Sequence, residues 1–351
     1  MIEMMASARR AQLQASRQHR RPIKSRMRIS ERSTFALRGL MLLTAAIFLH
    51  CVAGAQVSQP SRKSSGEEYT LKLNSNLVTL SATVLDHRNA LVSGLGRDDF
   101  QVYENGVPQP IKHFSHEDIP VTVGILVDNS TSMGPKRDDV IAAAMAFARS
   151  SNPQDQMFVV NFNEHVSFGL PAKILFTDNR DQLQEALSEI KTIGQTALYD
   201  GIAVGLDHLK QGNRDKKVLV LISDGGDNAS KHSLAQVLSM AKQSSAIIYA
   251  IGIYDASDSD QNPGVLNRFA RETGGKAYFP ESSREIPSIC EEIARDIRNQ
   301  YTLAYVPTIA AQDGSYRAIE VKASAPGHGR LSVRTRPGYF VSSAPSPLAV
   351  R

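Results

Sequence analysis

Hydrophobic and polar residues follow different patterns in different parts of this chain. Between residues 119 and 299, short apolar runs alternate with stretches in which apolar residues recur every three or four positions. The apolar runs are typical of buried strands, and the periodic stretches are typical of amphipathic helices. Strongly apolar strands interleaved with helices favour a mostly parallel sheet that helices cover on both faces. We therefore expect a doubly wound, Rossmann-like α/β domain.

The same pattern predicts where the elements of this domain lie. The expected strands are Val121–Val127, Met157–Asn161, Val218–Ser223, Ala246–Ile253 and Lys276–Phe279. The expected helices are Arg137–Ser150, Asp181–Ile190, Leu198–Lys210, Ser233–Ser244, Val265–Thr273 and Ile286–Arg298. Ligands of such sheets bind in the crevice outside the carboxyl ends of the strands. That edge is therefore the place to look for functional side chains.

The segments on either side of this domain have strand character without a helical period. Residues 69–118 alternate between apolar and polar positions, and Asn105-Gly106 is a strong hairpin signal within them. Residues 300–341 contain three more expected strands, at Tyr301–Val306, Tyr316–Ala323 and Leu331–Thr335. We expect the two segments to pair with each other, so that the α/β domain is an insertion in a β-sandwich-like unit.

Residues 1–55 have the composition of a secretory leader. Arginines precede an apolar run, Leu40–Val52, and the small-x-small sequence Ala53-Gly54-Ala55 follows it. We expect cleavage before Gln56. Because the run is shorter than the roughly 20 residues that cross a membrane, we expect an exported protein, periplasmic or extracellular, without a stable membrane span after cleavage. An uncleaved anchor and a lipid-bearing Cys51 are the alternatives.

The positive charge of the chain belongs to this leader. Ten of the 40 Lys and Arg residues lie in it, but only two of the 35 Asp and Glu residues, which leaves 30 basic and 33 acidic residues and a net charge of −3. No basic patch stands out in the chain after residue 55, so we expect no nucleic-acid partner. Residues 1–26 are unlike a signal, which makes Met27 an alternative start to Met1. Residues 56–68 have the composition of a linker and residues 342–351 that of a disordered tail.

Cleavage would remove Cys51 and leave Cys290 as the one cysteine of the chain. No intramolecular disulfide is then available, and the protein depends on its apolar core. Cys290 lies in a stretch with isoleucines at helical spacing, so we expect it to be a small core residue.

Oxygen-bearing side chains stand where three of the expected elements meet their loops. Asp128, Ser130 and Ser132 follow the first buried strand, Thr196 precedes a helix, and Asp224 follows the strand Val218–Ser223. Loops after adjacent strands of a doubly wound sheet converge on one crevice. A set of carboxylates and hydroxyls suits a hard cation such as Mg²⁺ better than zinc or copper.

The order Asp-x-Ser-x-Ser, a distant Thr and a distant Asp resembles the metal-ion-dependent adhesion site of von Willebrand factor type A domains, over residues 119–299. The resemblance implies that Ser130, Ser132 and Thr196 bind Mg²⁺ (or Mn²⁺ or Ca²⁺) directly, and that Asp128 and Asp224 act through water. It also implies that an Asp or Glu of a protein partner completes the octahedron. The motifs Asp99–Gly106 and Arg336–Phe340 are similar to those that flank such domains in an acidobacterial group.

Other interpretations of the same residues remain open at this point. Ser132 is also suited to capping the helix that begins near Lys136, and Asp227 to holding a turn. A metal-assisted hydrolase at this site would need a general base, for which His165 and Asp227 are the candidates. A third possibility is an ion that only stabilises the loops. We expect a non-enzymatic, exported binding protein.

Overall fold

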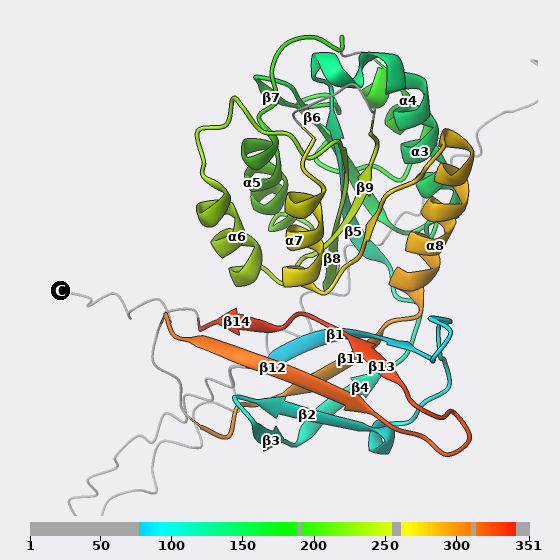
Figure 1. The fold of residues 1–351 in the computed structure, drawn as a ribbon, viewed down its shortest axis with the longest axis vertical. Helices are drawn as coiled ribbons and strands as arrows, with labels where there is room; N and C mark the ends of the chain where they lie inside the picture. The colour runs from blue at the N-terminus through cyan, green and yellow to red at the C-terminus, as the bar shows by residue number, and fades with distance from the viewer. Residues whose placement is uncertain (1–76, 189–190, 255–260, 310–313, 342–351) are drawn as a thin grey trace, which may run out of the picture. The chain divides into compact units, whose positions relative to one another are not determined.

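The computed structural model describes residues 77–188, 191–254, 261–309 and 314–341 (Figure 1). All of them belong to one compact unit that extends from Lys72 to Arg351. The expected leader, linker and tail lie outside the described residues, as does the first part of the expected N-terminal strand region. No helix in the described part of the chain is long and apolar enough to cross a membrane.

A six-stranded sheet forms the centre of the α/β domain, in the order β10-β9-β8-β5-β6-β7. All neighbouring strands are parallel except β6 and β7, which are antiparallel. The strands are β5 (Val121–Asp128), β6 (Gln156–Phe162), β7 (Val166–Phe168), β8 (Lys216–Ser223), β9 (Ile247–Gly252) and β10 (Ala277–Tyr278). The prediction of a doubly wound, mostly parallel sheet is confirmed.

Helices cover both faces of this sheet, with α3, α4 and α8 on one side and α5, α6 and α7 on the other (Figure 1). They are α3 (Arg137–Ser150), α4 (Arg180–Ser188), α5 (Leu198–Leu209), α6 (Leu234–Gln243), α7 (Pro263–Thr273) and α8 (Ile286–Arg298). The bounds of α3 and α8 agree with the prediction to the residue. Helix α6 is shorter because Ser233 caps it, with a hydroxyl that accepts a hydrogen bond from the backbone N–H of Gln236.

Strand β7 was not predicted from the sequence. It has three residues, pairs only with β6 among the described strands, and exposes Ser167 and Phe168. A short edge strand of this kind has too few residues to show an alternating pattern. It nevertheless sets one wall of a cavity considered below.

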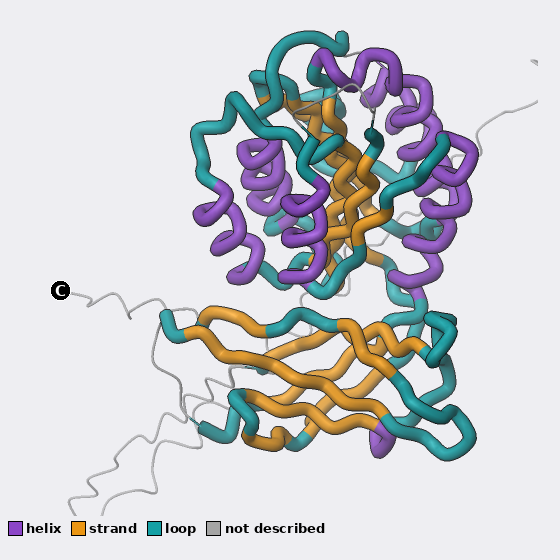
Figure 2. Tube along the Cα trace, viewed as in Figure 1, coloured by secondary structure: helices purple, strands orange, loops and turns teal. Residues whose placement is uncertain are grey.

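The flanking segments form two antiparallel four-stranded sheets, β13-β1-β11-β4 and β14-β12-β2-β3. Their strands are β1 (Val78–Leu85), β2 (Phe100–Glu104), β3 (Val107–Gln109), β4 (Ile111–Ser115), β11 (Tyr301–Tyr305), β12 (Tyr316–Ala323), β13 (Ser332–Arg334) and β14 (Gly338–Phe340). Each sheet combines strands from before and after the α/β domain, as predicted. In their described residues, the segments contain loops besides these strands and the short 3-10 turn Arg97–Asp99 (Figure 2).

Each part has its own apolar core. The α/β core is built from the sheet and the inner faces of its helices, and Cys290 lies in it, fully buried. The Cys290 thiol donates to the carbonyl of Ala143 at 3.1 Å, and burial raises its pKa to about 12. The prediction that Cys290 is a core residue is confirmed. The second core is shared by the two antiparallel sheets, and there Phe100 packs on Tyr301 with ring centroids 4.9 Å apart.

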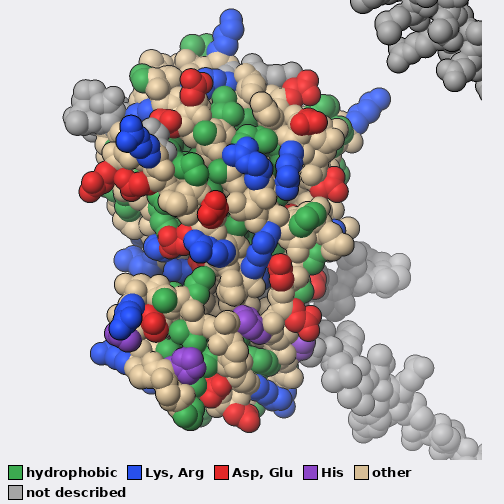
Figure 3. All heavy atoms as spheres, turned by 90° about the vertical axis from the view of Figure 1, so that its right-hand side faces the viewer, with side chains coloured by type: hydrophobic (Ala, Val, Ile, Leu, Met, Phe, Trp, Pro, Cys, Tyr) green, Lys and Arg blue, Asp and Glu red, His purple; other side chains and the backbone are tan. Residues whose placement is uncertain are grey.

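Charged side chains of both signs are interspersed on the molecular face shown in Figure 3. The exposed side chains of Lys210 and Asp207 form an ion pair at the end of α5.

A buried carboxylate on α8 connects several strands. Asp296 is 3% exposed and accepts hydrogen bonds from the Thr83 hydroxyl of β1, at 2.7 Å, and from the Tyr249 hydroxyl of β9, at 2.9 Å. It also forms an ion pair with Arg334 of β13. A buried charge is tolerated when all its partners are present, whereas removal of one partner strongly destabilises the folded protein.

We therefore expect Asp296→Ala to lower the free energy of unfolding by about 3 kcal/mol, because it leaves the Arg334 guanidinium without its partner. Urea unfolding followed by circular dichroism measures the change. The exposed Asp98→Ala serves as the matched control and should change stability little. The double variant Asp296→Ala/Arg334→Ala should lose less than the sum of the single losses. Full additivity would contradict the assigned pair.

Candidate metal centre

The candidate residues lie at the carboxyl ends of two adjacent central strands. In the parallel pair β5–β8, Val127 lies opposite Ile222, so the next residues, Asp128 and Ser223, are also neighbours. The Ser223 hydroxyl donates to Asp128 Oδ2 at 2.7 Å. Asp224 follows directly. Strand pairing alone therefore brings the Asp128 and Asp224 positions to one edge of the sheet.

The loop after β5 turns its hydroxyls toward the loop after β8. The backbone N–H of Ser130 donates to Asp128 Oδ1 at 2.9 Å, which forms a tight Asx-turn. The hydroxyl oxygens of Ser130 and Ser132 lie 3.2 Å apart, and Ser132 donates to Asp224 Oδ2 at 2.7 Å. Four of the five residues singled out in the sequence are thus joined by hydrogen bonds through side chains or backbone.

Thr196 is attached to the same region through its backbone. Its N–H donates to Asn228 Oδ1 at 2.9 Å, and its carbonyl accepts from the N–H groups of Asn228 and Ala229 at 3.0 Å each. These bonds hold the segment before α5 against the loop after β8. Within the described residues, the Thr196 hydroxyl makes no hydrogen bond to the other four, although the residue is only 6% exposed.

A layer of polar groups behind the site holds its loops together. Asn129 donates from Nδ2 to Asn161 Oδ1 at 3.0 Å, and its carbonyl accepts the N–H of Ile193 at 3.0 Å. Arg137 donates from Nη1 to Asn129 Oδ1 at 2.8 Å and to Thr192 Oγ1 at 3.0 Å. The guanidinium therefore connects the loop after β5 to the segment that leads to Thr196. The sequence contained no signal for this role of Arg137.

The loop after β8 approaches the next loop so closely that it requires a glycine. Gly225 has φ of +83°, and a Cβ placed on it would lie 2.4 Å from the Asn262 carbonyl oxygen. The Gly226 N–H donates to Asp224 Oδ1 at 3.0 Å, and the Asn262 N–H to the Asp224 carbonyl at 3.0 Å. The backbone of this loop therefore orients the Asp224 carboxylate.

The interpretation of Ser132 as a helix cap is wrong. Residues Thr131–Lys136 form a 3-10 helix. Helix α3 begins directly after Lys136, and no side chain caps its N-terminus. The Ser132 hydroxyl is directed at Asp224 instead. Asp227 holds a turn: its carboxylate accepts the Tyr199 N–H at 3.1 Å and the Ser230 hydroxyl at 2.5 Å. The His165 side chain is exposed in the turn between β6 and β7.

The electrostatics of the site favour a cation. Asp128 and Asp224 are each 2% exposed, and neither has a Lys or Arg ion-pair partner among the described residues. Burial, and then the negative charge of Asp224, raise the pKa of Asp128 to about 7. Two buried carboxylates with hydroxyls between them form a set of oxygen ligands that suits a hard divalent cation. Such a cation would stabilise the charged form of both carboxylates. No three His, Cys, Asp or Glu side chains form a metal-binding cluster in the described part of the chain.

Residues 122–292 match the family described as von Willebrand factor type A domain. This segment is a von Willebrand factor type A (VWA) domain. The match covers the sheet from β5 to β10, most of α8 and all five candidate residues. The VWA assignment agrees with the resemblance noted in the sequence, whereas the acidobacterial subgroup stays a prediction.

Solved structures with a similar fold share little sequence with this chain. BatB from Bacteroides thetaiotaomicron is 15% identical, with a TM-score of 0.41, over 50% of this chain and 98% of that one. A von Willebrand factor type A protein from Catenulispora acidiphila is 14% identical, with a TM-score of 0.46, over 77% and 75%. Proximal thread matrix protein 1 from the mussel byssus, with a zinc-occupied MIDAS motif, is 16% identical, with a TM-score of 0.45, over 55% and 49%. The comparison with curated proteins gave no match.

The close approach at Gly225 can be separated from simple backbone strain. Gly94 has almost the same φ, +82°, but a Cβ there would meet nothing within 4 Å. We expect Gly94→Ala to lower the free energy of unfolding by about 1 kcal/mol, from strain at positive φ alone. Gly225→Ala should lower it by roughly 1 kcal/mol more, because the methyl group also meets the Asn262 carbonyl. Urea unfolding of both variants measures the difference, and equal losses would contradict the close approach.

Proposed function

We propose that this protein is a non-enzymatic binding protein whose VWA domain holds a divalent cation, Mg²⁺ or alternatively Mn²⁺ or Ca²⁺. The proposed ligand set is Asp128, Ser130, Ser132, Thr196 and Asp224. The observation that carries the proposal is the hydrogen-bonded group of Asp128, Ser130, Ser132 and Asp224 at the ends of β5 and β8. Its two carboxylates are buried and, among the residues that the structure describes, form no ion pair with a cationic side chain, so a bound cation would balance their charge.

The hydrogen bonds of the two carboxylates support a role behind the hydroxyls. Asp128 already accepts from the Ser130 N–H and the Ser223 hydroxyl, and Asp224 from the Gly226 N–H and the Ser132 hydroxyl. Because Ser132 gives its hydrogen to Asp224, its oxygen can only accept: one lone pair faces the Ser130 hydroxyl, and the other is left for a cation. We infer that Ser130, Ser132 and Thr196 contact the ion directly, while Asp128 and Asp224 act through water.

A first shell dominated by neutral hydroxyls has a consequence for recognition. It leaves most of the positive charge of the ion uncompensated, so the ion attracts a further anionic oxygen. Mg²⁺ keeps octahedral geometry and fills its remaining positions with exchangeable water. We propose that an Asp or Glu side chain of a protein partner replaces one of these waters. The predicted leader would bring the protein to the periplasm or the exterior, where it would meet this partner.

The structure offers little to a hydrolytic mechanism. A metal-assisted hydrolase needs a base free to take a proton from metal-bound water. The Asp227 carboxylate already accepts hydrogen bonds from Tyr199 and Ser230, which commits it to the turn. We therefore propose binding rather than catalysis.

The ligand set is tested by isothermal titration of Mg²⁺ into the protein and its variants. We expect Asp128→Ala and Ser132→Ala to weaken Mg²⁺ binding by roughly 10- to 100-fold or more, since each removes a ligand or its orienting partner. Thr131→Ala is the matched control in the same loop, because its hydroxyl donates to the Gly194 carbonyl at 3.0 Å and not to the site. Circular dichroism establishes that each variant folds. Unchanged Mg²⁺ affinity in folded Ser132→Ala would refute the assignment.

The open coordination position is tested with Mn²⁺ as a paramagnetic probe. Exchangeable water on bound Mn²⁺ enhances the relaxation of bulk water protons. We expect acetate, a stand-in for an Asp or Glu side chain, to reduce this enhancement, and acetamide of the same shape to leave it unchanged, because only the anion displaces water effectively. A cation that serves only to stabilise the loops would raise the melting temperature but show no response to acetate.

A further inference from the structure

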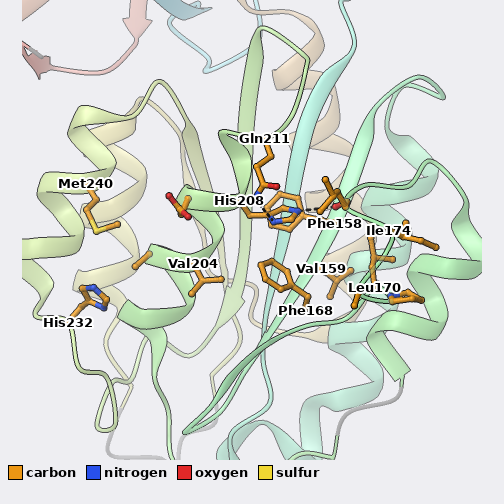
Figure 4. Close-up of a pocket in the computed structure, with 15 residues that line it drawn as sticks. Phe158, Val159, Phe168, Leu170, Ile174, Val204, His208, Gln211, His232 and Met240 are labelled. Atoms are coloured by element: carbon orange, nitrogen blue, oxygen red, sulfur yellow. Dashed lines mark hydrogen bonds between the residues drawn. The ribbon is translucent and has the colours of Figure 1, made fainter. Parts of the chain in front are cut away.

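A cavity of about 580 Å³ opens on the α5 side of the VWA domain (Figure 4). It lies between α5, the edge of the sheet at β6 and β7, and the loop that follows β7. It shares no residue with the candidate metal centre. Apolar side chains make most of its lining, among them Leu170, Ile174, Val204 and Met240. In Figure 4, His232 and Met240 lie on one side, Leu170 and Ile174 on the other, and Phe168 and His208 between them.

Aromatic rings form the inner wall of this cavity. The His208 ring lies 4.5 Å from the Phe158 ring and 4.6 Å from the Phe168 ring, measured between centroids. Phe168 is 48% exposed although it is a large apolar residue. An exposed ring face at the wall of a cavity attracts cations as well as apolar groups.

The hydrogen bonds around the cavity leave acceptor atoms free. His208 Nε2 must donate to the Leu175 carbonyl, 2.9 Å away, because a carbonyl only accepts. Its Nδ1 then accepts from Gln211 Nε2 at 3.5 Å, which leaves Gln211 Oε1 and the second hydrogen of Nε2 available. The Nδ1 of His232 donates to Asp200 Oδ1 at 2.7 Å. Its Nε2 accepts a hydrogen bond in the neutral ring and donates one in the charged ring.

A carboxylate completes this set of acceptors. Asp207 lines the cavity, and its Oδ1 pairs with Lys210 at 2.9 Å. Both side chains are more than 70% exposed, so the pair is weak and a competing cation can replace Lys210. Asp207 Oδ2 has no hydrogen-bond partner in the described part of the chain.

We propose that this cavity binds a small organic cation: a primary ammonium group on an alkyl or arylalkyl body. The apolar lining would bury the body, and the volume lies in the range of small-molecule sites. The ammonium would donate to the Asp207 carboxylate and to Gln211 Oε1, four residues further along the chain, and the Phe168 ring would add a cation–π contact. An anionic ligand would be repelled by the negative charge of Asp207.

Three ligands of similar body and different head group test the proposal on the full chain. They are 2-phenylethylammonium, neutral 2-phenylethanol and anionic phenylacetate, followed by NMR chemical-shift titration near neutral pH. We expect the ammonium to bind about tenfold more tightly than the alcohol, from the carboxylate and the ring together, and phenylacetate not to saturate. Equal binding of the ammonium and the alcohol, preferred binding of phenylacetate, or no saturable binding at all would overturn the proposal.

Two variants and a matched control assign the binding to this cavity. Asp207→Asn keeps the shape of the exposed side chain and should abolish the preference for the ammonium while retaining the alcohol. Val204→Trp should fill the cavity and remove both. Asp98→Asn, which removes a carboxylate from the 3-10 turn Arg97–Asp99, should bind as the unaltered protein does. An ammonium preference that survives Asp207→Asn, or binding that survives Val204→Trp in a folded variant, would refute the site.

Discussion

The register between β5 and β8 is the constraint on which the candidate metal centre depends. Because Val127 lies opposite Ile222, the two strands end together and Asp128 lies beside Ser223. A shift of one residue would turn every side chain of one strand to the other face of the sheet. The apolar residues of both strands are buried on both faces, so such a shift has no favourable alternative. The core therefore determines the position of the carboxylates.

Burial of these carboxylates is opposed by desolvation, and the loops are built to offset it. Each carboxylate oxygen of Asp128 and Asp224 accepts a hydrogen bond, two from backbone N–H groups and two from serine hydroxyls. Hydrogen bonds offset part of the desolvation penalty of a charge, but not the repulsion between two like charges. The remaining imbalance is the physical reason for expecting a cation between them. Arg137, bound to Asn129, Thr192 and the carbonyl of Leu187, is engaged elsewhere.

The sequence predicted those features that depend on repeated patterns. The strands of the α/β sheet appeared as apolar runs because both of their faces are covered, and α3 and α8 appeared as periodic stretches. The strands β7 and β14 were missed, since three residues at a sheet edge carry no period. The proximity of Asp128, Ser130, Ser132 and Asp224, which hydrogen bonds join, was predicted from their place at strand ends, whereas their role as ligands stays a prediction. The role of Arg137 was not predicted, because its partners are distant in sequence and include two backbone carbonyls.

Helix α5 belongs to the surroundings of both proposed sites. It begins at Leu198, directly after the segment that carries Thr196. Its later residues Val204 and His208 line the cavity that we propose as the site for an organic cation. A shared helix transmits binding from one site to another only if it has two arrangements of similar free energy. The packing of α5 opposes a second arrangement: a Cβ on Gly205 would lie 3.1 Å from Leu126, so the helix already lies close against β5. Movement of α5 along the sheet would break these core contacts. The structure therefore favours two sites that bind independently on one rigid helix.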